Sequence, residues 1–209
     1  MAIAVIAWSF ALYGPSVYLH TISQQHNWSI GLVSSALTLS FLVNASVLIF
    51  VGPAIARYGA KPMMMAGSAS MAIGLSSMGQ VTEVWQIYPA FALMGLGWSC
   101  LSTTALTTTL APWFSKFQGR AVSTAMLGAS VGGMIGVPFL LTLIETVGFE
   151  RAMLCAGLIV VVVIWPISFF VLKRRPQDMG LHPDGLSGIG QTSAAEAKQW
   201  TRKTALQTN

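Results

Sequence analysis

Six long apolar segments follow one another along the sequence, joined by short polar connections. Each is close to the roughly 20 residues that a helix needs to cross a hydrocarbon core about 30 Å thick. None has a charged residue in its interior, where one Lys, Arg or Asp would cost roughly 2.5–3.5 kcal/mol. The predicted membrane-spanning helices are residues 2–22, 31–51, 62–80, 86–110, 121–144 and 151–172.

The composition agrees with a lipid environment. Only 8% of the 209 residues are charged, against roughly 25% in soluble domains. The first segment lacks a basic start and is too long for the apolar core of a signal peptide, so we interpret it as a true span. We therefore expect an all-α membrane protein, with residues 1–172 forming one six-helix bundle and residues 173–209 forming a mostly disordered polar tail.

Basic residues between the spans predict the orientation, because short loops rich in Lys and Arg stay in the cytoplasm. One side of the predicted topology carries Arg57, Lys61, Lys116, Arg120, Lys173, Arg174 and Arg175. The opposite side carries Arg151 beside Glu83, Glu145 and Glu150. Both termini are therefore predicted to lie in the cytoplasm, in a multi-pass protein of the cell (inner or plasma) membrane.

Several other classes of protein are disfavoured. The net charge of +5 does not indicate nucleic-acid binding, since the basic residues neither alternate with aromatic residues nor gather on one predicted face. Cys100 and Cys155 lie inside apolar segments and read as small buried hydrophobes, with no disulfide or metal site. The sequence has no nucleophile motif, no paired intramembrane carboxylates and no nucleotide-binding glycine loop. We expect neither an enzyme nor a cofactor.

Polar and bent positions inside the first two spans are candidates for lining a substrate cavity. Pro15 follows Gly14 and removes a backbone donor, so the helix should bend beside Tyr13 and Tyr18. Bent helices near the membrane centre often mark substrate sites in transporters, although an ordinary kink is the alternative. Asn44 needs a partner within the bundle, so it either joins helices or contacts substrate.

The fourth span has hydroxyl groups at steps of four residues, at Ser99, Thr103 and Thr107. This spacing places them on one face of a continuous helix. They either line a water-filled path, as further candidates for the substrate cavity, or bond back to carbonyl groups of their own helix.

The fifth span repeats glycine at steps of four residues, at Gly128, Gly132 and Gly136. Small residues on one helix face let two backbones approach closely in lipid, for either a moving or a static contact. Residues 10–14 also resemble residues 91–95, which fits a three-plus-three repeat, although chance produces matches of this length.

The connection between the second and third spans, residues 52–62, has the most specific pattern. It resembles the signature between helices two and three of the major facilitator superfamily of transporters; a generic basic loop is the alternative reading. Gly52, Arg57, Gly59 and Lys61 match that signature, and Ala56 stands at its aspartate. In the family this aspartate belongs to a charge network that latches the cytoplasmic gate, so the resemblance does not extend to that latch.

Further stretches are similar to the monocarboxylate and oxalate–formate branch of that family. They are residues 26–29, 119–121, 128–133 with Pro138, and 176–185. Together the resemblance covers about residues 3–185, the first half of a twelve-helix transporter. It implies alternating access to a small organic anion such as a monocarboxylate. Phe91 occupies the place of an arginine found in many antiporters of the family, so proton coupling is not implied.

The leading hypothesis is therefore half of a transporter, with the lipid bilayer, a small carboxylate and a second six-helix half or second copy as partners. A truncated product, a split gene and an assembly of two copies are all compatible with it. The alternative is a six-helix interaction or scaffold protein of the membrane that transports nothing.

The orientation is testable with reporter fusions. A reporter that is active only in the cytoplasm, fused after Arg175, should be active, because most short-loop basic residues lie on that side. The matched fusion after Glu83 should be inactive. External activity of the Arg175 fusion would contradict the orientation.

Overall fold

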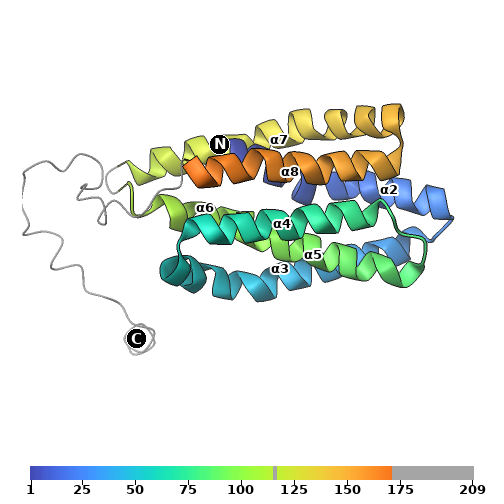
Figure 1. Cartoon of the computed structure of the whole chain (residues 1–209), viewed down its shortest axis with the longest axis horizontal. Coiled ribbons are helices and arrows are strands. Elements are labelled where there is room, and N and C mark those ends of the chain that lie inside the picture. The colour runs from blue at the N-terminus through green and yellow to red at the C-terminus, as the bar shows by residue number, and fades with distance from the viewer. Residues whose placement is uncertain (115–116, 171–209) are drawn as a thin grey trace, which may run out of the picture.

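The computed structural model describes residues 1–114 and 117–170, and in this part of the chain the regular structure is helical throughout (Figure 1). Its elements are α1 (Ala2–Ala7), η1 (Trp8–Tyr13), α2 (Gly14–His26), α3 (Ile30–Tyr58), α4 (Ala60–Met78), η2 (Val84–Gln86), α5 (Ile87–Leu101), α6 (Thr103–Leu110), α7 (Gln118–Val147) and α8 (Phe149–Phe170). The predicted tail, residues 173–209, Lys116 and the stretch 176–185 lie outside the described residues.

These elements form six antiparallel rods, and the predicted all-helical membrane bundle is confirmed. The first rod joins α1, η1 and α2, and the fourth joins η2, α5 and α6. By length and composition, five rods can cross a membrane. The remaining rod, α4, has 19 residues, but its serines, glycines and Lys61 make it less apolar. It packs between α5 and α8, where much of its surface is covered by protein.

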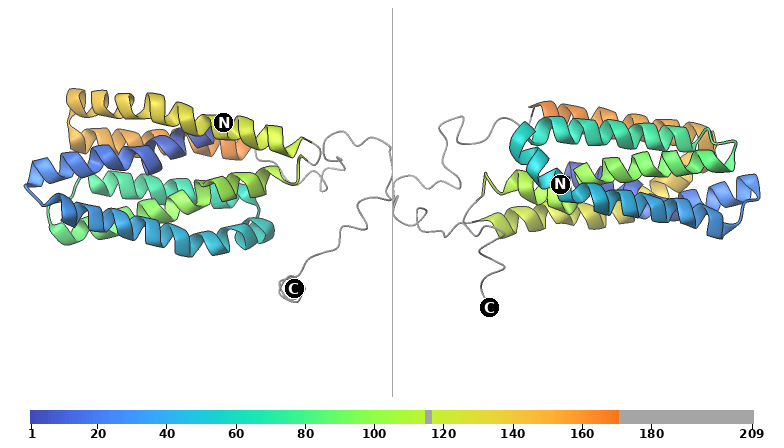
Figure 2. Two further views of the ribbon diagram at one scale, coloured as in Figure 1. Left: turned by 180° about the vertical axis from the view of Figure 1, so that it is seen from behind. Right: turned by 90° about the horizontal axis from the view of Figure 1, so that it is seen from below.

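The rods form two layers. The α4 and α8 helices pack against each other on the side that faces the viewer in Figure 1. Seen from behind, the first and fourth rods lie between α7 and α3 (Figure 2). Both α2 and α6 contact α3 as well as α7, so the two central rods close the space between the flanking helices.

The pairing of helices indicates a three-plus-three repeat. The second rod, α3, packs on α5 of the fourth rod, and the fifth rod, α7, packs in the same way on α1 and η1 of the first. The third and sixth rods, α4 and α8, pack on each other. If rods one and four, two and five, and three and six are taken as equivalent pairs, these contacts are the same in both halves. Because equivalent rods run in opposite directions, the repeat is inverted.

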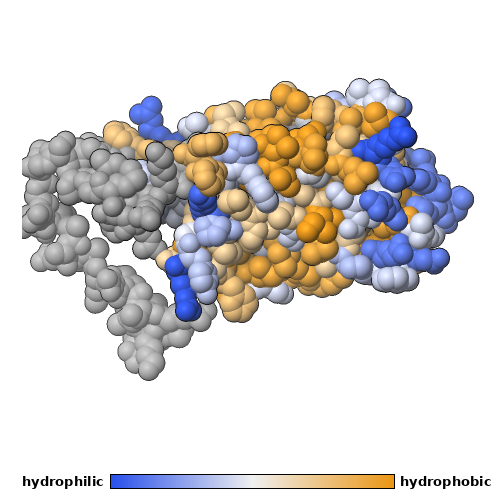
Figure 3. All heavy atoms as spheres, in the orientation of Figure 1, coloured by the Kyte–Doolittle hydropathy of each residue, from blue (hydrophilic) through white to orange (hydrophobic). Residues whose placement is uncertain are grey.

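The connections alternate between the two ends of the bundle. The turn between α3 and α4 and the connection from α6 to α7 lie at the end where the chain begins and α8 finishes (Figure 1). This end carries Arg57, Lys61 and Arg120, and the opposite end carries the described acidic residues. The space-filling view shows hydrophilic ends around a hydrophobic middle (Figure 3). Which end faces the cytoplasm stays a prediction.

Residues 26–29 form the turn into α3. Asn27 has φ +54°, in the left-handed region that asparagine tolerates better than most residues. The hydroxyl of Ser29 then accepts a hydrogen bond from Leu32 N at 3.3 Å and caps the helix. The rings of His26 and Trp28 stack with their centroids 4.6 Å apart. This stretch is therefore a local helix-starting device.

Three buried glycines of α7 form its contact with the first rod. A Cβ on Gly132 would lie 2.7 Å from the carbonyl oxygen of Val5, and one on Gly128 would lie 2.6 Å from that of Met1. A Cβ on Gly136 would overlap the side chain of Ser9. The hydroxyl of Ser9 is shared between two carbonyl acceptors, that of Val5 on its own rod at 2.7 Å and that of Gly132 at 2.9 Å. The absence of side chains thus permits both close packing and a hydrogen bond between helices.

We predict that Gly132→Leu abolishes folding, because the obstructing atom is backbone and cannot rotate away. Gly132→Ala should destabilise the bundle by about 1–3 kcal/mol, the usual cost of overpacking. Gly119→Ala in the first turn of α7 is the matched control, since nothing lies within 4 Å of a Cβ at that position. Thermal unfolding of the purified variants in detergent would measure the difference, and equal stability of both alanine variants would contradict it.

Candidate substrate-facing surface

The exposed side chains of the central rods differ from those of α8. The first rod exposes Tyr13, Ser16 and His20 along one stripe, and α6 exposes Thr103 and Thr104. From residue 158 onward α8 exposes only apolar side chains and Pro166 among its described residues. A purely apolar face suits lipid, whereas hydroxyl, phenol and imidazole groups at membrane depth need water, protein or solute as neighbours.

The two tyrosines of the first rod have different environments. Tyr13 is 37% exposed and its ring packs on Gly133 of α7, where a Cβ would lie 2.9–3.1 Å from three ring atoms. Tyr18 is fully buried, and its hydroxyl donates to the carbonyl of Phe10 at 3.1 Å. Of these two candidates, only Tyr13 lies where a solute could touch it.

The fourth rod is broken at Ser102. This residue has an extended ψ of 172°, so α5 ends at Leu101 and α6 begins at Thr103. The hydroxyl of Ser102 donates to the carbonyl of Ser99 at 2.9 Å, which replaces one lost helix bond. The first bond within α6 joins Leu106 N to Ser102 O, so the amide groups of residues 103–105 precede the helical ladder.

The break separates the three hydroxyl candidates of this rod. Ser99 is fully buried and donates to Leu96 O at 2.7 Å. Thr107 is half-buried and donates to Thr104 O at 3.0 Å. Thr103 is exposed at the start of α6. Ser99 and Thr107 thus bond back to their own helices, and Thr103 is the candidate open to a solute.

Asn44 joins the second and fourth rods. With its amide oriented to suit its neighbours, Asn44 Oδ1 accepts from Trp98 Nε1 at 3.1 Å and from Ser99 N at 3.3 Å. The ring of Trp98 meets that of Trp8 edge to face, with centroids 4.7 Å apart. Asn44, a half-buried residue, therefore links three rods indirectly.

The signature connection forms a tight turn between α3 and α4. Gly59 has φ +91°, a value that side-chain-bearing residues rarely adopt, which explains the glycine. Lys61 Nζ lies 3.7 Å from the ring centroid of Phe169 on α8, and the guanidinium of Arg57 lies 5.4 Å from that of Tyr58. A Cβ on Gly52 would meet nothing within 4 Å. Cation–π contacts thus engage both basic residues of this turn.

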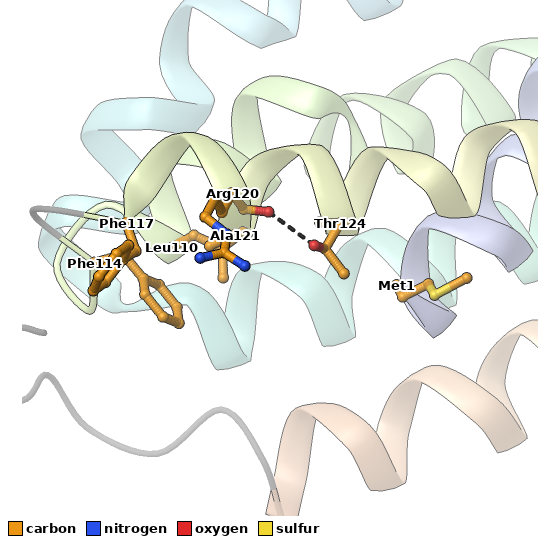
Figure 4. Close-up of a pocket in the computed structure, with 8 residues that line it drawn as sticks. Met1, Leu110, Phe114, Phe117, Arg120, Ala121 and Thr124 are labelled. Carbon is orange, nitrogen blue, oxygen red and sulfur yellow. Dashed lines mark hydrogen bonds between the residues drawn. The ribbon is translucent and has the colours of Figure 1, made fainter.

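A pocket of about 430 Å³ lies at the same end of the bundle (Figure 4). It is lined by Met1, Leu110, Phe114, Phe117, Arg120, Ala121, Thr124 and Ala125. Most of this lining is apolar, and the guanidinium of Arg120 lies 6.0 Å from the ring centroid of Phe117. Among the described residues, no group of three metal-binding side chains comes together here or elsewhere. The pocket is therefore suited to an apolar or amphiphilic group.

Two irregular segments of this surface were not predicted from the sequence, the π-helix in the first rod and the break in the fourth. The π-helix η1 precedes the bend expected at Pro15, and the break at Ser102 occurs without proline or glycine. A signal was present for the second, since Thr103, Thr104, Thr107, Thr108 and Thr109 crowd one short segment. Branched side chains and hydroxyls that compete for backbone groups both weaken a helix.

The fold and surface together define a bundle of membrane-spanning helices with a polar face. The sequence profile described as Major Facilitator Superfamily matches residues 1–203, so the chain belongs to that family of transporters. The family expected from the sequence is thus confirmed; its monocarboxylate and oxalate–formate branch is not.

Two relatives are known as multidrug resistance protein MdtH. That of Yersinia enterocolitica serotype O:8 is 30% identical over 132 residues, which are 63% of this chain and 33% of that protein. That of Shigella dysenteriae serotype 1 is 31% identical over 134 residues, which are 63% of this chain and 32% of that protein. The match therefore spans about a third of the length of these curated relatives.

Cysteine labelling tests the assignment of exposed and buried candidates. In a background with Cys100→Ala and Cys155→Ser, a water-soluble maleimide should modify Tyr13→Cys and Thr103→Cys in the membrane. It should leave Tyr18→Cys and Ser99→Cys unmodified, since those side chains are fully buried. Leu158→Cys on the apolar face of α8 is the control for exposure to lipid and should also stay unmodified. Protection of both Tyr13→Cys and Thr103→Cys would contradict a water-accessible surface.

Proposed function

We propose that this chain is one six-helix bundle of an alternating-access transporter for a small organic solute, in the cell membrane with both termini in the cytoplasm. Residues 1–172 form the bundle, and residues 173–209 begin the segment that leads toward a second bundle. The observation that carries the proposal is the polar stripe on the central rods between α3 and α7. In a twelve-helix arrangement, such a stripe would line the path between two bundles, where water and solute replace lipid.

The flanking helices support a second bundle as partner. In the most apolar stretches of α3, α7 and α8, 17%, 28% and 33% of residues are buried, against 61% in the first and fourth rods. The kinds of side chain exposed must therefore separate a protein-facing surface from a lipid-facing one. The α3 helix exposes Ser35, Thr38 and Ser46 on the membrane-depth part of its surface. Since α8 exposes only apolar side chains and Pro166 from residue 158 onward and so suits lipid, the hydroxyls exposed on α3 favour contact with protein. The partner is a second six-helix half or a second copy of this chain.

The break in the fourth rod favours an anionic solute such as a monocarboxylate. The amides of residues 103–105 stand at the positive end of α6 and carry no side-chain cap. Helix starts of this kind attract carboxylates, and the hydroxyls of Thr103 and Thr104 add donors beside them. Asn44, through its bond to Ser99 N, lies next to the turn that precedes the break. Tyr13, Asn44 and Thr103 are the residues proposed to face the substrate path.

The turn between α3 and α4 is proposed to act without the carboxylate of the family signature. Ala56 offers no charge to Arg57 and Lys61. Lys61 instead lies over Phe169 and ties the start of α4 to the end of α8. This contact holds the turn to its own bundle, so a gate here would close through packing rather than through an ion pair.

Transport is tested by expressing the chain from its own locus, so that any partner encoded beside it is present, and also alone. Cells should accumulate labelled acetate or lactate above the background set by Gly132→Leu, the variant expected not to fold. Thr103→Val should reduce the rate several-fold, since it removes a donor beside the proposed anion site. Thr142→Val is the matched control, because the hydroxyl of Thr142 is already bonded to Pro138 O at 2.9 Å.

Three arms separate the possible outcomes of this experiment. Efflux of the cationic dye ethidium without carboxylate uptake would overturn the anionic substrate and agree with the name borne by the relatives. Carboxylate uptake that depends on the neighbouring gene would support a two-chain transporter. Flux of neither probe, with the chain folded and membrane-inserted, would contradict transport and favour a scaffold.

A further inference from the structure

The backbone of the first rod contains a carbonyl that no backbone amide can reach in the local register. The segment η1 is a π-helix, in which backbone bonds reach five residues back, and the amide that follows it, Gly14 N, bonds to Ser9 O. The next bond of this pattern would join residue 15 to the carbonyl of Phe10. Residue 15 is proline and has no N–H. Phe10 is buried, and an unpaired buried carbonyl is strongly unfavourable.

The side chain of Tyr18 supplies the missing donor. Its hydroxyl bonds to Phe10 O at 3.1 Å, eight residues back, and no part of the residue is exposed. Gly14 makes room for this ring, because a Cβ there would lie 2.7 Å from Tyr18 Cζ and would overlap the hydroxyl. Three residues therefore act together. Gly14 leaves space for the ring of Tyr18, Pro15 leaves the carbonyl of Phe10 without an amide donor, and the hydroxyl of Tyr18 supplies that donor.

The π-helical segment fixes where Tyr13 lies. Ser9 is bonded to the carbonyl of Gly132, and Tyr13 rests on Gly133 of the same helix, α7. Both ends of η1 are thus fixed on one neighbour, and the register between them sets the direction of the Tyr13 ring. A change of one residue in that register would turn the ring by about 100° around the helix axis.

We propose that Tyr18 is a positioning residue for the exposed polar surface: its hydroxyl stabilises the π-helical turn that holds the ring of Tyr13 over Gly133. The description of Tyr13 as substrate-facing rests on the proposed function, whereas the positioning itself does not. Tyr18 touches no solute in this role, because it is enclosed by the bundle.

The test uses the whole chain, purified in lipid nanodiscs, and the substitution Tyr18→Phe, which removes one oxygen and keeps the ring. Hydrogen exchange of the amides of residues 12–14 and 16 should accelerate about tenfold, the size expected for loss of one buried hydrogen bond. Tyr88→Phe is the matched control, since its hydroxyl bonds to Ser35 Oγ at 3.0 Å, between α3 and α5. It should leave exchange in η1 unchanged.

A second readout follows Tyr13 directly. With 3-fluorotyrosine at all four tyrosines, the fluorine resonance of Tyr13 should shift or broaden in Tyr18→Phe and stay in place in Tyr88→Phe. Resonances are assigned from the single phenylalanine variants. An unchanged Tyr13 resonance in Tyr18→Phe would overturn the proposal, whatever the exchange in η1, and so would unchanged exchange in η1.

The substitution Pro15→Ala provides a second test, which remains informative if Tyr18→Phe alone folds poorly. Alanine at position 15 restores an amide, so the carbonyl of Phe10 no longer depends on the phenol. Tyr18→Phe should then change exchange in η1 by less than twofold in the Pro15→Ala background. An equal effect in both backgrounds would show that the hydroxyl acts independently of Pro15 and would overturn the proposal. Neither readout depends on transport, so failure of the proposed function would be recognised separately.

Discussion

The contact of α7 with the first rod is the interaction on which the central part of the bundle depends. Lipid is as apolar as leucine, so helices in a membrane gain little from hiding apolar side chains from it. Their association must come from close backbone contact and from hydrogen bonds between helices. Gly128, Gly132 and Gly136 provide the first, and the bond from Ser9 to Gly132 O provides the second.

Other crossings use the same principle. Gly67 and Gly97 lie against each other's carbonyl groups between α4 and α5, and a Cβ on Gly74 would lie 2.8 Å from Ala90 O. Gly157 brings α8 onto α4, where a Cβ would lie 2.8 Å from Ala72 O. Glycine thus marks the crossings of several rods. A Cβ on Gly31, Gly52, Gly119 or Gly148 would meet nothing within 4 Å, so these glycines are not required by a helix crossing.

The sequence was sufficient for the number and order of the rods because lipid imposes a length and excludes charge. It also placed Gly59 in a tight turn, where the structure shows why only glycine fits easily. The burial of individual side chains was harder to predict from the sequence. Tyr18 and Ser99 belong to polar types that suggest a cavity, yet both are enclosed. Which face of a helix points inward depends on its phase, and the π-helix and the break at Ser102 each change that phase.

These two irregular segments share a physical requirement. Backbone groups freed within a membrane must find partners in the protein or in a water-filled cavity. At the π-helix the partner is internal, since Tyr18 occupies the carbonyl of Phe10. At the break, Ser102 occupies the carbonyl of Ser99, while the amides of residues 103–105 lie in the part of the chain where Thr103 and Thr104 are exposed.

In the first rod, the freed carbonyl of the irregular segment is thus bonded to a side chain of the same rod. In the fourth rod, the freed amides after the break have no side-chain cap. This difference falls between two rods that the inverted repeat makes equivalent. A bundle built only to be stable would satisfy both in the same way. Under the proposed function, the uncapped start of α6 on one central rod and the ring of Tyr13 on the other are the two groups that would meet a polar solute.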